Sequence, residues 1–151
     1  MKKHLLILMI LCYYVHGYSQ TKVNVDEIKG VCLKLEMINA KSNLAYKVVM
    51  QNRKIIASKT VSGIQTGKKV TKVDKKLYHL VKQSLFSKGN MYSLPDTIHC
   101  RQCANGTMVT LSVRTKAGKK MISGKDPEEE NKDMKYILEY ISGMVGIIDE
   151  F

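Results

Sequence analysis

Two cysteines separated by two residues, Cys100 and Cys103, form the most reactive local pattern in the chain. Such a pair can share a metal ion, cycle between dithiol and disulfide, or close a small structural disulfide ring. His99 next to the pair and Cys32 far upstream could complete a metal site, because zinc prefers thiolate and imidazole ligands. The residue types alone therefore leave three chemistries open.

The beginning of the chain helps to choose among these chemistries. Residues 1–19 combine a basic start, an apolar run from Leu5 to Val15 and small residues at Gly17 and Ser19, as a cleavable signal peptide does. The apolar run is too short to span a membrane, so we expect no transmembrane anchor after cleavage. Residues 20–151 are then a single exported domain, periplasmic or secreted.

Export favours a structural disulfide between Cys100 and Cys103, because disulfides persist in oxidising compartments. Cys32 is then the remaining free thiol. A thiol or metal protein that uses the Cys100–Cys103 pair is the alternative. The sequence shows no serine-hydrolase, zinc-protease or phosphate-loop motif, so we predict a non-enzymatic protein that needs no cofactor and no metal.

Positive charge is the strongest global feature. Lys and Arg number 25 against 13 for Asp and Glu, which gives a formal net charge of +12. Basic residues are concentrated between Arg53 and Lys88, whereas acidic residues gather from Asp126 onward. We predict a partner-binding surface on a basic helix and the loop before it, formed by Lys68, Lys69, Lys72, Lys75, Lys76 and Lys82.

The expected partner is an unidentified protein or an anionic component of the cell envelope. Lysines without interleaved aromatic residues argue against nucleic-acid recognition, and export makes nucleic acid a poor partner. A solvated helix face without any ligand is the alternative interpretation of the same lysines. His79 is expected on this exposed helix face as well.

The periodicity of apolar residues predicts the elements that position these groups. Alternation predicts strands at residues 31–37, 44–50 and 54–60, and again at 108–115 and 120–123. Residues 62–71 are expected to form an exposed loop, because Gly63 and Gly67 lie there among Lys and Thr.

Two helices are expected. The first covers residues 73–88, starts with a capping box at Thr71–Asp74 and ends where Gly89 adopts a left-handed conformation. The second starts with Asp126 as N-cap and Pro127 at the first position, and ends near Gly143 or Gly146. Its apolar stripe consists of Met134, Ile137, Leu138, Ile141 and Val145. The order β-β-β-α-β-β-α predicts an α+β domain with an antiparallel sheet of about five strands and two helices on one face.

The C-terminal half also resembles a known family. Leu85-Phe86, Ser93-Leu94-Pro95, Cys103-Ala104-Asn105-Gly106, the Gly118 hairpin and the helix at Pro127 follow one another as in small exported bacterial domains of the emfourin type. Some of those domains inhibit metalloproteases, so the resemblance implies a protease-inhibitor-like protein as a further alternative. The glycine-rich inhibitory segment of the family has no match between Asn39 and Ile64, so only the fold is transferred.

Overall fold

The structure is a computed structural model and describes residues 24–103 and 105–146. The predicted signal peptide at residues 1–19 and the side chain of Val145 lie outside the described part. Within residues 24–103 and 105–146, every helix falls short of the length and apolar character that crossing a bilayer requires.

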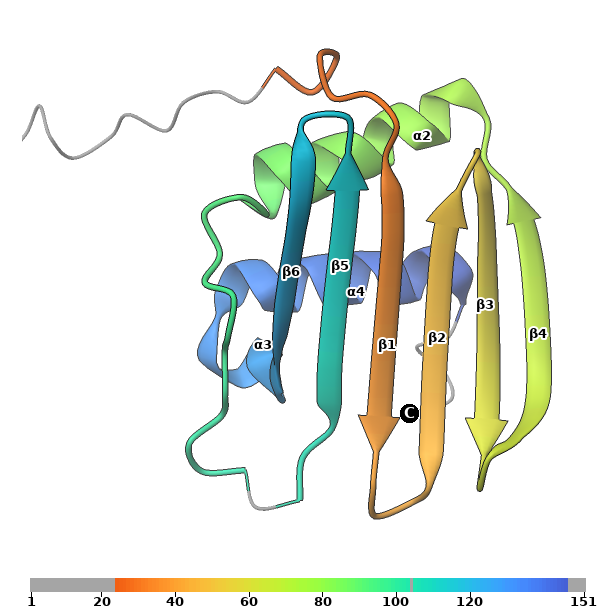
Figure 1. Cartoon of the computed structure of the whole chain (residues 1–151), viewed down its shortest axis with the longest axis vertical. Coiled ribbons are helices and arrows are strands. Elements are labelled where there is room, and N and C mark those ends of the chain that lie inside the picture. The colour runs from red at the N-terminus through yellow and green to blue at the C-terminus, as the bar shows by residue number, and fades with distance from the viewer. Residues whose placement is uncertain (1–23, 104, 147–151) are drawn as a thin grey trace, which may run out of the picture.

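A six-stranded antiparallel sheet is the centre of the fold (Figure 1). Its strands lie in the order β4-β3-β2-β1-β5-β6. Their bounds are Cys32–Asn39 for β1, Leu44–Gln51 for β2, Lys54–Val61 for β3, Ile64–Lys72 for β4, Met108–Thr115 for β5 and Gly118–Lys125 for β6. The predicted α+β class and antiparallel sheet are confirmed, and the expected strand number of about five is corrected to six.

The additional strand is β4, where the sequence predicts an exposed loop. β4 pairs with β3 from Lys54↔Lys72 to Val61↔Ile64, with a register shift between Lys59 and Thr60. Most of its side chains are exposed on both sides of the strand. An edge strand with little apolar surface to bury lacks the alternation by which a strand is recognised, so the loop prediction is wrong for this segment.

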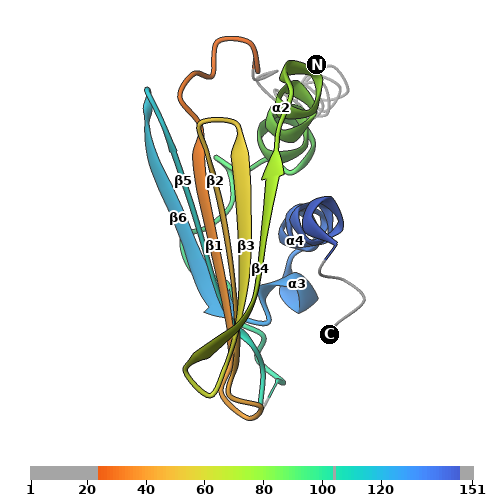
Figure 2. The same cartoon turned by 90° about the vertical axis from the view of Figure 1, so that its right-hand side faces the viewer.

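All helices lie on one face of the sheet, as predicted, and the opposite face is uncovered by the described residues (Figure 2). They are α2 (Lys75–Lys82), the π-helical turn η1 (Gln83–Lys88), α3 (Pro127–Glu130) and α4 (Lys132–Val145). The core between the two layers contains fully buried side chains from both, among them Leu33, Leu35, Met50, Leu111, Ile122, Leu85, Phe86, Ile137 and Ile141.

The first helix differs from the prediction at both ends. α2 begins at Lys75, and the carboxylate of Asp74 accepts a hydrogen bond from the Leu77 amide at 2.7 Å. Gly89 follows η1 with φ −83°, so it is not left-handed; Asn90 takes that conformation, with φ 48°. Glycine is needed at position 89 for space, because a Cβ would collide with Ile137 and with the backbone of η1.

The second predicted helix is divided into α3 and α4. Asp126 occupies the N-cap position of α3 and Pro127 follows it, as predicted, but the Asp126 side chain makes no capping hydrogen bond: this residue has φ 41°, and its carboxylate accepts from the Thr107 amide at 2.7 Å. Asn131 interrupts the helix and caps α4 by accepting from the Met134 amide at 3.0 Å. α4 ends at Gly146 with φ 66°, which is one of the two predicted positions.

The two edges of the sheet are built differently. Residues 96–100 run parallel to β6, where the amides of Ile98 and Cys100 donate to the carbonyls of Ser123 and Lys125 at 3.0 and 2.8 Å. The Ser123 amide donates back to the Asp96 carbonyl at 2.9 Å. This covering segment protects the β6 edge, whereas lysines mark the β4 edge.

Candidate functional site

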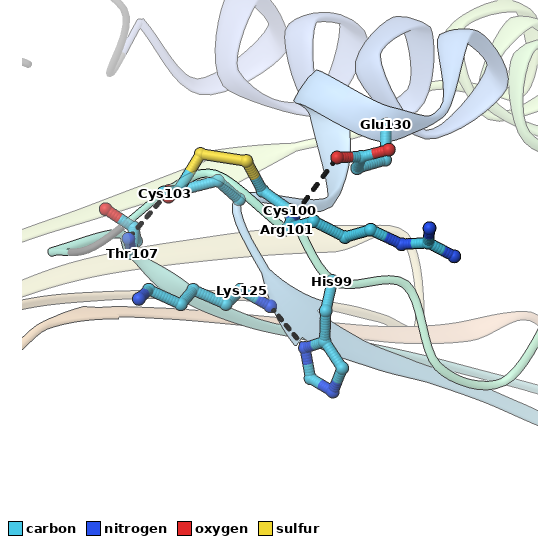
Figure 3. Close-up of a disulfide and its surroundings, with 8 residues drawn as sticks. His99, Cys100, Arg101, Cys103, Thr107, Lys125 and Glu130 are labelled. Carbon is cyan, nitrogen blue, oxygen red and sulfur yellow. Dashed lines mark hydrogen bonds between the residues drawn. A yellow bond between two sulfur atoms is a disulfide. The ribbon is translucent and has the colours of Figure 1, made fainter.

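The Cys100–Cys103 disulfide is present at the end of the covering segment beside β6 (Figure 3). The Arg101 amide donates to the Glu130 carboxylate at 3.1 Å and so connects the disulfide loop to α3. His99 Nδ1 accepts from the Lys125 amide at 3.0 Å. Both neighbours of Cys100 are therefore engaged in positioning the loop.

The structure does not assemble the metal site that these residues could have formed. Cys32 is free and half-buried, and it pairs with Arg114 at the end of β1 far along the sheet from Lys125. Over residues 24–103 and 105–146 there is no cluster of three or more His, Cys, Asp or Glu side chains suited to a metal ion.

We expect the Cys100→Ala/Cys103→Ala variant to lose about 2 kcal/mol of unfolding free energy, because the disulfide restricts a short loop in the unfolded chain. Urea unfolding under non-reducing conditions measures this change, with Cys32→Ala as the matched single-thiol control. Unchanged stability would contradict a structural role for the disulfide. Stoichiometric metal bound by the reduced parent would favour the metal alternative.

The structure distributes the six predicted binding lysines over several surfaces. Lys68 and Lys72 lie on the uncovered face of the sheet, because they pair with Ser58 and Lys54. Lys69 pairs with Ala57 and belongs to the helix-covered face. Lys75 and Lys76 are exposed at the start of α2. The predicted single surface on the helix and its preceding loop is therefore not the arrangement found.

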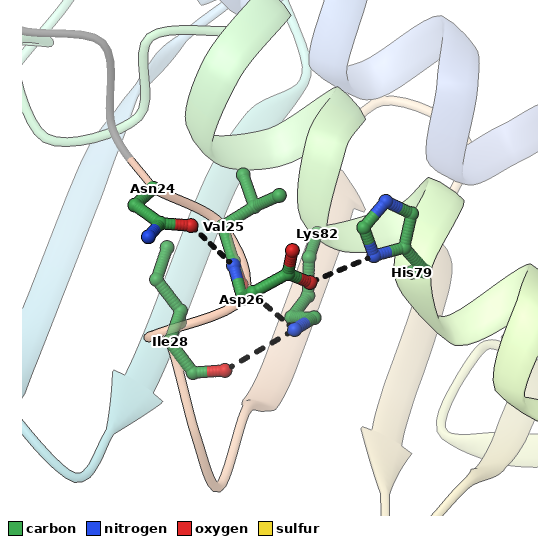
Figure 4. Close-up of polar contacts among 6 residues, drawn as sticks. All are labelled: Asn24, Val25, Asp26, Ile28, His79 and Lys82. Atoms are coloured by element: carbon green, nitrogen blue, oxygen red, sulfur yellow. Dashed lines mark hydrogen bonds and ion pairs between the residues drawn. The ribbon is translucent and has the colours of Figure 1, made fainter.

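Lys82 is the clearest correction, because the prediction that it lies on an exposed face is wrong. It is only 8% exposed, and its Nζ donates to the carbonyls of Val25 and Ile28 at 2.7 and 3.4 Å (Figure 4). The ammonium also lies 5.8 Å from the centre of the Tyr78 ring. Lys82 thus fastens residues 24–31 to α2 and takes no part in an exterior surface.

His79 supports the same attachment. Its Nδ1 lies 3.2 Å from the Asp26 carboxylate, so this side chain has a partner that the sequence did not indicate (Figure 4). The amide of Val31 adds a further contact by donating to the Tyr78 hydroxyl at 3.2 Å. Three side chains of α2 therefore hold the segment that precedes β1.

The strands are strongly cationic, which the sequence order did not reveal. Glu36 is the one acidic residue in the six strands, all of which are described. The strands contain eleven cationic residues: Lys34, Lys47, Lys54, Lys59, Lys68, Lys69, Lys72, Arg114, Lys119, Lys120 and Lys125. The other described acidic residues lie in helices and connecting segments.

The register assigns most of these cations to the uncovered face. Alternating side chains occupy opposite faces of a sheet, and the core residues define the helix-covered one. We call the other side the open face; its cations are Lys34, Lys47, Lys54, Lys68, Lys72, Arg114, Lys119 and Lys125. In the sequence, several of these cations are polar residues that alternate with apolar ones in the predicted strands. Only the strand order shows that the polar residues of different strands share one surface.

Glu36 is surrounded by this positive charge. Its carboxylate lies 3.2 Å from Lys34 Nζ and 3.3 Å from Lys47 Nζ. Partial burial raises the pKa of Glu36, but hydrogen bonds and charge from both lysines outweigh this and hold the pKa below its ordinary value. The carboxylate therefore stays ionised and reduces the excess positive charge only at the centre of the face.

Like charges lie directly opposite each other on the open face. Lys54 pairs with Lys72 across β3 and β4, and Arg114 pairs with Lys119 across β5 and β6. Opposed like charges destabilise an antiparallel pair by a few tenths of a kcal/mol up to about 1 kcal/mol. The sheet bears this cost on both sides of its centre, which is unexpected if the residues served stability alone.

Apolar side chains are interspersed with these cations. Ile38, Ile56, Val70, Met108 and Met121 lie on the open face and are between 36% and 57% exposed. Val49, Ile56 and Val70 are paired neighbours in a row across β2, β3 and β4. The open face is thus both cationic and partly apolar.

Acidic groups lie on the other layer, around α3. Burial raises the pKa of the Glu128 carboxyl, and the charges of Asp126 and Glu129 add to the rise. Glu128, Glu129 and Glu130 all lie in the first turn of α3. Acidic residues are therefore in excess in α3 and α4, whereas α2 and η1 carry lysines and no acidic residue.

Neither a family model, nor a curated protein, nor a solved structure matches the chain. The emfourin-type resemblance stays a prediction.

Proposed function

We propose that the protein is an exported, non-enzymatic binding domain that holds an anionic partner on the open face of its sheet. The proposal keeps the binding function expected from the sequence and moves the contact from α2 to the strands. Lys68 and Lys72 belong to the proposed surface, whereas Lys82 belongs to the interior. The partner is an acidic protein or an anionic component of the envelope.

The opposed like-charge pairs are the observation that supports this proposal. Selection for stability would place opposite charges at Lys54↔Lys72 and Arg114↔Lys119, because such pairs stabilise a sheet. A bound anion removes the repulsion, since it lies between the cations and neutralises both. The cost in the free protein is then compensated in the complex.

We expect charge position, and not total charge, to govern binding to a polyanion. The face variant K54Q/K68Q/K72Q and the helix variant K75Q/K76Q/K132Q each remove three exposed lysines. On an immobilised heparin column, the face variant should elute at clearly lower salt than the helix variant, because clustered charges act together on one polyanion. Circular dichroism checks that both variants are folded.

Equal elution of the two variants would contradict the proposal, because the column would then detect only net charge. R114Q/K119Q is a second face variant, and it alters strands far from β4. The first face variant removes lysines from the β4 edge and could aggregate there, whereas R114Q/K119Q leaves that edge unchanged. The thiol or metal protein and the protease-inhibitor-like protein stay predictions, since nothing on the described residues favours either over a binding surface.

A further inference from the structure

The open face combines two properties. It presents eight cations against Glu36, and it also exposes five large apolar side chains among them. Isolated apolar residues on a protein surface are ordinary. Here the three side chains of Val49, Ile56 and Val70 are neighbours in one row, with Lys54 and Lys72 next along the same strands.

We propose, on the basis of the proposed function, that the anionic partner is a lipid surface with acidic headgroups. Lysines at a membrane attract acidic lipids, and apolar side chains beside them enter the boundary between headgroups and acyl chains. The open face offers both contacts at once over six neighbouring strands. Ile56, Val70 and Met121 are the apolar contacts, and the surrounding lysines pair with lipid phosphates.

Other occupants fit the same face less well. A second copy of the chain would bring its own eight cations against these eight, and like charges across an interface oppose association. A soluble acidic polymer would satisfy the lysines but would give Ile56 and Val70 no apolar environment. The combination of charge and exposed aliphatic residues therefore favours lipid.

Vesicle sedimentation with the full chain tests this inference. The parent protein should sediment with phosphatidylglycerol/phosphatidylcholine vesicles and not with vesicles of phosphatidylcholine alone. K54Q/K68Q/K72Q should weaken binding on the order of 100-fold, because each lysine near an acidic membrane contributes roughly fivefold. K75Q/K76Q/K132Q removes the same charge from the helix layer and should weaken binding much less.

The apolar substitutions separate a membrane from a soluble polyanion. I56S/V70S keeps every charge and should weaken vesicle binding by roughly tenfold, since two partly buried aliphatic side chains are lost. The same variant should elute from heparin like the parent. If I56S/V70S binds vesicles like the parent, or if heparin competes while vesicles capture nothing, the partner is an acidic polymer and the lipid proposal is wrong.

The apolar run at Leu5 to Val15 is present in the full chain and could itself bind lipid. It is identical in every variant, so it cannot produce a difference between the face and helix variants. Equal binding of all variants to both vesicle types would assign the binding to that run and overturn the proposal. If the face and helix variants also elute from heparin at the same salt concentration, both the lipid proposal and the proposed function are wrong.

Discussion

The Gly124→Ala variant is expected to lose at least ~3 kcal/mol of unfolding free energy, because a Cβ at this position would occupy the space of the Ile98 backbone. Displacing the covering segment exposes Ile98, which contributes about 2 kcal/mol by burial. It also breaks the hydrogen bonds from Ile98 and Cys100 to β6, worth about 1 kcal/mol each.

Chemical denaturation measures the unfolding free energy of Gly124→Ala, and Gly67→Ala is the matched control. An added Cβ at Gly67 would meet Lys59 Cβ at 3.7 Å, an ordinary contact, so its effect should stay within about 0.5 kcal/mol. Both substitutions add one methyl group to an outer strand of the same sheet. Similar stabilities for the two variants would show that the segment at residues 96–100 is not fixed against β6.

The Lys82→Met variant is expected to lose about 2–3 kcal/mol, because the carbonyls of Val25 and Ile28 would lose the ammonium that donates to them. Methionine keeps most of the apolar stem of lysine, so the loss reports the charged head and not the packing. Residues 24–31 should then exchange their amide hydrogens faster than the sheet does.

Lys76→Met is the matched control, since it makes the same substitution at an exposed site of α2 and should change stability by less than about 0.5 kcal/mol. Thermal unfolding and hydrogen exchange of both variants measure the difference. A Lys82→Met variant more stable than the parent would mean that burial of the ammonium costs more than its two hydrogen bonds contribute.

Strands and helices that bury one apolar face were predictable from the sequence. β1 and β5 alternate because one face of each packs against helices, and α4 shows its stripe from Met134 to Ile141 for the same reason. β4 was missed because an edge strand with exposed side chains on both faces has no such pattern.

The lysines illustrate why a surface is harder to predict than an element. Helical periodicity assigned Lys82 to a polar face, but its partners are backbone carbonyls of a segment far away in sequence. No residue type marks such a partner. Lys34 and Arg114 were recognisable in the sequence as polar residues of alternating strands, yet their proximity depends on β1 and β5 being neighbours.

The cationic open face and the acidic excess of α3 and α4 lie on opposite sides of the sheet, so the molecule has an electric dipole component across its thin dimension. In the field of an acidic surface, a torque turns such a molecule before any contact is made, so that its positive side arrives first. Productive collisions then become a larger share of all collisions. Orientation is thereby settled at a distance of about one Debye length, roughly 8 Å at physiological salt, and short-range contacts have only to retain a molecule that already faces the right way.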